Sequence, residues 1–229
     1  MKTVIITGAN GNLGVEVTKL FLDKNYRVLA TISKETARSD FQSNPNLIIS
    51  VVNLTNEKET NDFIQKSIQL YRVIDAALLL VGGFAMGNLS ATSGEDLRKQ
   101  ITLNFETAYF VTRPLFEHLM GNKRGSIVFI GARPALNPAQ GKDLIAYSLS
   151  KSLLFKLAEF LNEEAKGVNV SVSVIVPSTL DTPLNRKSMP DVNPDNWVKP
   201  SEIAETLEFL VSDKSRALKE TVLKMYNNS

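Results

Sequence analysis

Apolar and β-branched residues form short continuous runs along this chain, rather than runs that alternate with polar residues. Continuous runs of this length suit strands that are buried on both faces of a sheet. The runs span residues 3–6, 28–32, 47–52, 74–81, 126–130 and 170–176, and a last run at 221–226 predicts an edge strand.

Between these runs, apolar residues recur at helical spacing, as at Leu153, Leu157 and Phe160. Strands that alternate regularly with helices require right-handed crossovers, which produce a parallel sheet covered on both sides. We therefore predict an α/β fold, a single doubly wound (Rossmann-like) domain over residues 1–229 with a parallel, seven-stranded sheet. The stretch 177–200 is rich in Pro, Asn and Asp and longer than ordinary connections, so we expect either a lid over a site or a disordered loop.

Composition limits the partners and the chemistry. The 229 residues include no cysteine, which excludes disulfides, thiol catalysis and cysteine-type zinc sites. The 26 basic and 24 acidic side chains form no basic stripe, so we expect no nucleic-acid partner. No apolar run approaches the ~20 residues of a membrane span, and the apolar stretch at the N-terminus is too short for a signal peptide. We expect a cytoplasmic protein that binds no membrane and no metal, with the single histidine, His118, in a helix-end or surface role.

A glycine-rich turn follows the first run and leads into a helix predicted to begin near Val15. Glycines at this position let a pyrophosphate approach backbone amides at a helix N-terminus. The alternative is a turn that only packs the helix on the sheet, but the strand–turn–helix context favours dinucleotide binding. The predicted cofactor-binding residues of this turn are Gly8, Asn10, Gly11, Asn12, Leu13 and Gly14.

The end of the second run bears on the choice of cofactor, because an acidic residue there would hold a ribose 2′-hydroxyl. The run ends with Ile32, Ser33 and Lys34, and none of these is acidic. Ser33 and Lys34, with Arg38 nearby, favour the 2′-phosphate of NADPH over NADH. The alternative is that Lys34 and Arg38 are ordinary solvated charges.

Tyr147 and Lys151 are four residues apart at the start of a predicted helix, so both side chains can point into one pocket. A nearby cation favours the phenolate and lowers the pKa of a tyrosine from its reference value of about 10. The spacing is common by chance. Its position after a strand, in a chain that already has a dinucleotide turn, indicates an acid–base pair.

Together these motifs resemble the short-chain dehydrogenase/reductase family over essentially the whole chain. The resemblance implies that Tyr147 is the general acid or base, that Lys151 holds the nicotinamide ribose and lowers the Tyr147 pKa, and that Asn104 anchors a water in the proton relay. The helices that carry Asn104 and Lys151 are those with which the family associates, which implies a homodimer or homotetramer. Further cofactor contacts are implied at Asn53, Leu54, Gly82, Gly83, Pro177, Thr179 and Thr182.

Two departures from the family pattern bear on the reaction. Ala132 occupies the place of the catalytic serine, and Gly82-Gly83 replaces the usual Asn-Ala-Gly. Removing a donor to a developing oxyanion typically costs about 2.7–4 kcal/mol. A ketone reduction would suffer from that loss, whereas a strongly electrophilic acceptor that mainly needs hydride and a proton from Tyr147 would suffer less.

A narrower resemblance, to quinonoid dihydropteridine reductases, fits this reasoning. It rests on residues 176–190 with Trp197, and on the segments 82–88 and 131–136. These reductases also lack the serine, and the resemblance implies that Phe84, Ala132 and Tyr147 face the substrate.

The cofactor remains a choice between two forms. The dihydropteridine reductases carry Asp at the place of Ile32 and prefer NADH, whereas Ser33 and Lys34 favour NADPH. We expect NADPH, with NADH as the alternative.

We therefore predict an NAD(P)H-dependent reductase that transfers hydride to a quinonoid dihydropterin or a similar small quinoid or carbonyl acceptor, with Tyr147 as proton donor. One alternative is a carbonyl or quinone reductase of the same family with an unknown substrate. An alternative of another class is a module that senses NADPH without turnover; the missing serine allows it, and the intact Tyr147 and Lys151 argue against it.

Overall fold

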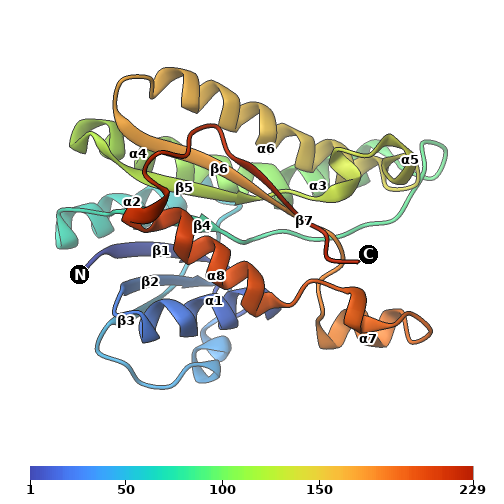
Figure 1. Ribbon diagram of the computed structural model, residues 1–229, viewed down its shortest axis with the longest axis horizontal. Coiled ribbons are helices and arrows are strands. Elements are labelled where there is room, and N and C mark those ends of the chain that lie inside the picture. Colours follow the sequence, from blue (N-terminus) through green and yellow to red (C-terminus); the bar gives the residue numbers. More distant parts are fainter. Residues whose placement is uncertain (229) are drawn as a thin grey trace.

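A computed structural model describes residues 1–228 as seven parallel strands flanked by helices (Figure 1). The strand order is β3-β2-β1-β4-β5-β6-β7. The strands are β1 (Thr3–Thr7), β2 (Arg27–Ile32), β3 (Leu47–Val51), β4 (Ala76–Leu79), β5 (Arg124–Ile130), β6 (Asn169–Pro177) and β7 (Val222–Met225). The doubly wound fold and the parallel, seven-stranded sheet predicted from the sequence are confirmed.

Eight α-helices lie among the described residues, with short 3₁₀ turns between some of them. They are α1 (Asn12–Asp23), α2 (Glu57–Tyr71), α3 (Gly94–Ile101), α4 (Thr107–Asn122), α5 (Pro138–Gly141), α6 (Ile145–Glu164), α7 (Pro183–Ser188) and α8 (Pro200–Val211). Within the described chain no helix is both long and apolar enough to cross a membrane.

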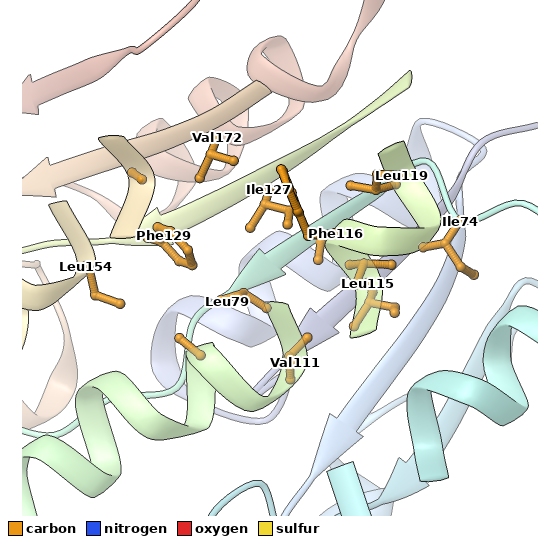
Figure 2. Packing of buried hydrophobic residues seen from close by; sticks show 14 of the residues in the cluster. Ile74, Leu79, Val111, Leu115, Phe116, Leu119, Ile127, Phe129, Leu154 and Val172 are labelled. Carbon is orange, nitrogen blue, oxygen red and sulfur yellow. The ribbon is translucent and has the colours of Figure 1, made fainter. Parts of the chain in front are cut away.

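The sheet separates two layers of helices. Helices α1 and α8 lie on one side of it and α4 and α6 on the other (Figure 1). On the second side, Leu115 and Leu119 of α4 pack with Ile127 and Phe129 of β5, as Figure 2 shows. Strand β1 pairs with β2 and β4 and is buried along its whole length, as a continuous apolar run requires.

The predicted run 74–81 forms a shorter strand than expected. The backbone N–H of Ile74 donates to Nε2 of His118 at 3.2 Å, and that of Leu80 donates to the hydroxyl of Thr7 at 3.0 Å. Side chains thus take the ladder positions at both ends, and β4 is limited to Ala76–Leu79.

Helices α3 and α4 are joined by a π-helical turn over Thr102–Glu106. Such turns insert a residue into a helix and are frequent at functional sites. Here the turn contains Asn104, whose side chain is fully buried. The sequence predicts the helix but not the change of pitch within it.

The long stretch 177–200 is ordered around its own short helix, α7. Leu180 and Val198 pair across the base of this stretch, and Trp197 is only 2% exposed. Trp197 therefore anchors the end of this stretch in the body of the protein.

Candidate active site

Gly8, Gly82 and Lys151 lie at the carboxyl ends of β1, β4 and β5, where the strand order changes direction beside β1. A Cβ atom added to Gly82 would lie 2.8 Å from Oδ1 of Asn104 and 3.0 Å from Nζ of Lys151. One added to Gly8 would lie 3.0 Å from Cγ2 of Val81. The glycine turn, the loop after β4 and the start of α6 therefore form one edge.

The glycine turn keeps the start of α1 open. Gly8 has φ +62°, and a Cβ atom on Gly14 would lie 2.2 Å from the carbonyl oxygen of Gly8, so both positions require glycine. Exposed Gly11 precedes the helix without a side-chain cap. The first amides of α1 are thus free for an anion, and this geometry fits a dinucleotide pyrophosphate. The helix begins at Asn12, three residues before the predicted start.

The end of β2 presents two exposed polar residues, Ser33 and Lys34. Arg38 is engaged differently from the expectation, because its guanidinium pairs with the carboxylate of Glu35 and donates to the carbonyl oxygen of Ile49 at 3.3 Å. The pairing holds the pKa of Glu35 below its usual range. Among the three basic or polar candidates, Arg38 is therefore the one already partnered.

Of the two predicted residues that follow β3, Asn53 lies at the surface and Leu54 lies in the core. Asn53 is exposed, and its side-chain oxygen accepts bonds from the backbone and hydroxyl of Thr55 at 3.2 and 2.7 Å. Leu54 is 6% exposed and belongs to the hydrophobic core. The Leu54 side chain thus packs inward, and any cofactor contact from it would come from the backbone.

Tyr147 and Lys151 lie one turn apart on α6, and burial governs both of them. Lys151 is 5% exposed and its Nζ donates to the carbonyl oxygen of Ile130 at 2.8 Å. Burial lowers the pKa of Lys151 to about 8 and raises the pKa of Tyr147 to about 12. The depression of the Tyr147 pKa expected from a neighbouring ammonium does not appear here, because desolvation by burial raises that pKa.

The side chain of Asn104 is occupied by protein groups. Its Oδ1 accepts from the backbone N–H of Gly83 at 2.8 Å, and its Nδ2 donates to the carbonyl oxygen of the same residue at 3.0 Å. Asn104 thereby fixes the loop that follows β4. The expected contact between Asn104 and a relay water stays a prediction.

An aromatic residue borders Tyr147 on the solvent side. The ring of Phe84 meets that of Tyr147 edge-on, with centroids 5.2 Å apart, and Phe84 itself is 64% exposed. Ala132 is buried at the end of β5 and offers no side-chain donor. The ring of Phe84 thus provides an apolar surface beside the Tyr147 phenol, and Ala132 supplies no second hydroxyl.

Pro177, Thr179 and Thr182 lie near the start of the stretch 177–200. Pro177 ends β6, and the carbonyl oxygen of Thr179 accepts from the backbone N–H of Val198 at 2.9 Å. Thr182 is buried and caps α7 through its hydroxyl, which accepts from the N–H of Asn185 at 3.2 Å.

His118 has the structural role expected for it. Its Nε2 accepts from the backbone N–H of Ile74 near the end of α4, and burial lowers its pKa. No cluster of potential metal ligands occurs in residues 1–228.

Four contacts of this region were not predicted from the sequence. Gln100 and Ser150 both bond to Asn104, Asp181 holds Arg186 through two hydrogen bonds of 2.6 and 2.9 Å, and the guanidinium of Arg133 lies 4.6 Å from the ring centroid of Tyr226. Only Gln100 carries a signal in the sequence, as it lies one helical turn before Asn104. The other contacts join residues that are distant in the chain or lie in an irregular loop.

Comparison with known proteins gives a consistent family. Residues 2–193 match the family described as short chain dehydrogenase. A dihydropteridine reductase from Dictyostelium discoideum is 32% identical over 233 residues, covering 100% of this chain and 96% of its own. A 3-oxoacyl-[acyl-carrier-protein] reductase from Thermotoga maritima is 26% identical, covering 93% and 92%.

The fold has close counterparts among solved structures. The structure of ElxO with NADP bound superposes with a TM-score of 0.91 at 21% identity, covering 98% of this chain and 96% of that one. The chain therefore belongs to the short-chain dehydrogenase family and is an NAD(P)-dependent oxidoreductase. Within that family it is similar over its full length to a dihydropteridine reductase, and the non-catalytic sensor considered from the sequence is set aside.

Proposed function

We propose that the protein reduces a quinonoid dihydropterin, or a closely similar quinoid acceptor, at the edge formed by Tyr147, Lys151 and Phe84. The observation that carries this proposal is the buried Ala132 in a chain that keeps both Tyr147 and Lys151, with Lys151 bonded to the carbonyl oxygen of Ile130, two residues before Ala132. A site without the serine hydroxyl suits an acceptor that needs hydride and one proton more than stabilisation of an oxyanion. The 32% identity to a dihydropteridine reductase over the whole chain supports the same substrate class.

The cofactor would lie along the carboxyl edge of the sheet. We propose that the open amides at the start of α1 hold its pyrophosphate, with the ribose ends near Ser33 and Lys34 on one side and Lys151 on the other. Further contacts are proposed for Asn53, the backbone of Leu54, Gly82, Gly83, Pro177, Thr179 and Thr182. A bound reduced nicotinamide supplies the hydride.

The protein's own residues would manage the proton. With a pKa of about 12, Tyr147 is a phenol at neutral pH and is ready to donate. The Lys151 ammonium would stabilise the resulting phenolate, because the two side chains lie one helical turn apart. Phe84 would limit water at the phenol. One proton and one hydride convert the dihydro form to the tetrahydro form, which balances the two-electron reduction.

For the cofactor itself we propose NADPH. Lys34 is exposed at the end of β2, and position 32 holds Ile rather than an acidic residue, which favours binding of a 2′-phosphate. Arg38 contributes less to this binding because it pairs with Glu35. NADH is the alternative.

We further propose that the chain forms one domain, in which residues 177–200 act as a lid. We also propose that the protein associates as a homodimer. Exposed apolar side chains on α6 support the association: Leu149, Leu153 and Phe160 are 51%, 38% and 65% exposed.

A second candidate is carbonyl reduction, which the similarity to 3-oxoacyl reductases favours. The test is a steady-state comparison of quinonoid dihydropterin with a 3-oxoacyl thioester, each with NADPH and NADH. The proposal expects a kcat/KM at least tenfold higher for the dihydropterin. A faster reaction with the thioester would replace the proposal with the second candidate.

A further inference from the structure

A buried polar network surrounds Asn104 and reaches the backbone of Tyr147. Its members come from three elements: Gln100 from α3, Asn104 from the π-helical turn and Ser150 from α6. Asn104 and Ser150 are fully buried and Gln100 is 5% exposed. In a network buried this deeply, a missing hydrogen bond leaves a polar group unpaired and lowers the stability of the fold. The hydrogen bonds of this network therefore hold the three elements in one arrangement.

The geometry centres on one amide nitrogen. Nδ2 of Asn104 lies 2.9 Å from Oε1 of Gln100, 3.1 Å from Oγ of Ser150 and 3.0 Å from the carbonyl oxygen of Gly83. The amide has two N–H groups for these three acceptors. Each acceptor therefore constrains where the amide points.

Ser150 passes this constraint to Tyr147. Its Oγ accepts from Asn104 and donates its own proton to the carbonyl oxygen of Tyr147 at 2.7 Å. Asn104 also accepts a hydrogen bond from the backbone N–H of Gly83, and the next residue, Phe84, contacts the Tyr147 ring. The network thus connects the turn of α6 that carries Tyr147 to the loop whose Phe84 contacts the Tyr147 ring.

We propose that Gln100 and Ser150 are positioning residues for Tyr147, acting through the side chain of Asn104. Neither side chain touches the reacting groups. They fix the distance between α6, which carries Tyr147 and Lys151, and the loop at Gly83. This inference rests on the proposed function for its kinetic test only.

The test compares Gln100→Met and Ser150→Ala with the control Ser152→Ala. Ser152 lies on the same helix as Ser150 and donates to the carbonyl oxygen of Ser148 at 2.8 Å. The Ser152→Ala substitution therefore removes a similar hydroxyl that makes no contact with Asn104. The first readout is the ¹³Cζ resonance of Tyr147 at neutral pH, assigned by its loss in Tyr147→Phe. The second is kcat with quinonoid dihydropterin, together with the cofactor KM.

We expect the Tyr147 resonance to move in Gln100→Met and Ser150→Ala and to stay in place in Ser152→Ala. We expect kcat to fall roughly tenfold in the first two variants, as small displacements of a reacting group do, with the cofactor KM within about twofold of the parent. The double variant should lose less than the product of the two single losses, because both act on one amide.

Two results would overturn the inference. One is a Tyr147 resonance that responds no more to Ser150→Ala and Gln100→Met than to Ser152→Ala. The other is a loss of kcat that is equal in all three variants. A parent that does not turn over dihydropterin, with the resonance still moving as expected, contradicts the proposed function and leaves the positioning role intact.

Discussion

Under the proposed function, we expect Ala132 to determine which acceptors this site reduces well. It is buried where the family pattern places a serine, so a developing oxyanion would find no hydroxyl from this position. We predict that Ala132→Ser raises kcat/KM for a 3-oxoacyl thioester about tenfold or more and changes kcat/KM for dihydropterin less than threefold. Parallel steady-state assays of both substrates check this, and an equal change for the two substrates would show that the residue does not discriminate.

Lys151 makes the stability of the protein depend on pH. Its pKa is about 8 in the folded chain, below the reference value of about 10.4. Between these values the unfolded chain binds more protons, so the free energy of unfolding rises with pH. Above about pH 10 the raised pKa of Tyr147 acts in the opposite direction, because the folded chain then keeps the extra proton.

We predict that Lys151→Met removes this rise. The parent should gain up to about 3 kcal/mol relative to the variant between pH 7 and pH 10. Urea unfolding at several pH values measures the difference, and parallel curves for the two proteins would refute it.

At the scale of elements, continuous apolar runs are enough to predict the sheet. All seven runs become strands, because strands buried on both faces leave a simple pattern in the sequence. The glycine turn and the pair of Tyr147 and Lys151 are also visible, since their chemistry depends on residues that are close in the chain.

Other features depend on contacts that no local pattern records. The π-helical turn at Asn104 follows from pairing with Gly83 and Ser150, which are 21 and 46 residues away. The raised pKa of Tyr147 follows from burial, which spacing alone does not show. Such features could not be predicted from the sequence because they arise only once the elements pack.

The segment after β7 forms hydrogen bonds to the end of the proposed lid. Nδ2 of Asn227 donates to the carbonyl oxygens of Trp197 and Asp195 at 3.0 and 3.4 Å. We predict that Asn227→Gly, which keeps a residue suited to the φ of +50° there, opens the lid more often. Trypsin cleavage at exposed Arg186 should accelerate roughly two- to tenfold, which corresponds to a loss of about 0.5–1.5 kcal/mol from these hydrogen bonds.

The matched control for the lid is Asn228→Gly, a change at the next exposed position. It should leave the rate of cleavage unchanged. If both variants are cleaved at the rate of the parent, Asn227 does not hold the lid.

At the scale of the whole molecule, the apolar face of α6 bears on association. We predict that the parent has twice the mass of the chain in sedimentation equilibrium, and that Leu153→Glu shifts it to the mass of one chain, because a charge on a buried contact is costly. Leu218→Glu, at another exposed leucine, should leave the mass unchanged. A parent with the mass of a single chain would contradict the proposed dimer.

The central claim is that Tyr147 protonates a quinonoid dihydropterin that receives hydride at this site. The most direct measurement is the rate of NADPH and NADH oxidation with that substrate, by the parent and by Tyr147→Phe, with cofactor affinity measured separately. We predict rapid oxidation by the parent, a loss of about 10²- to 10⁴-fold in the variant, and cofactor affinity retained in both. Equal rates in the two proteins, or a parent that binds cofactor and oxidises none of it, would contradict the claim.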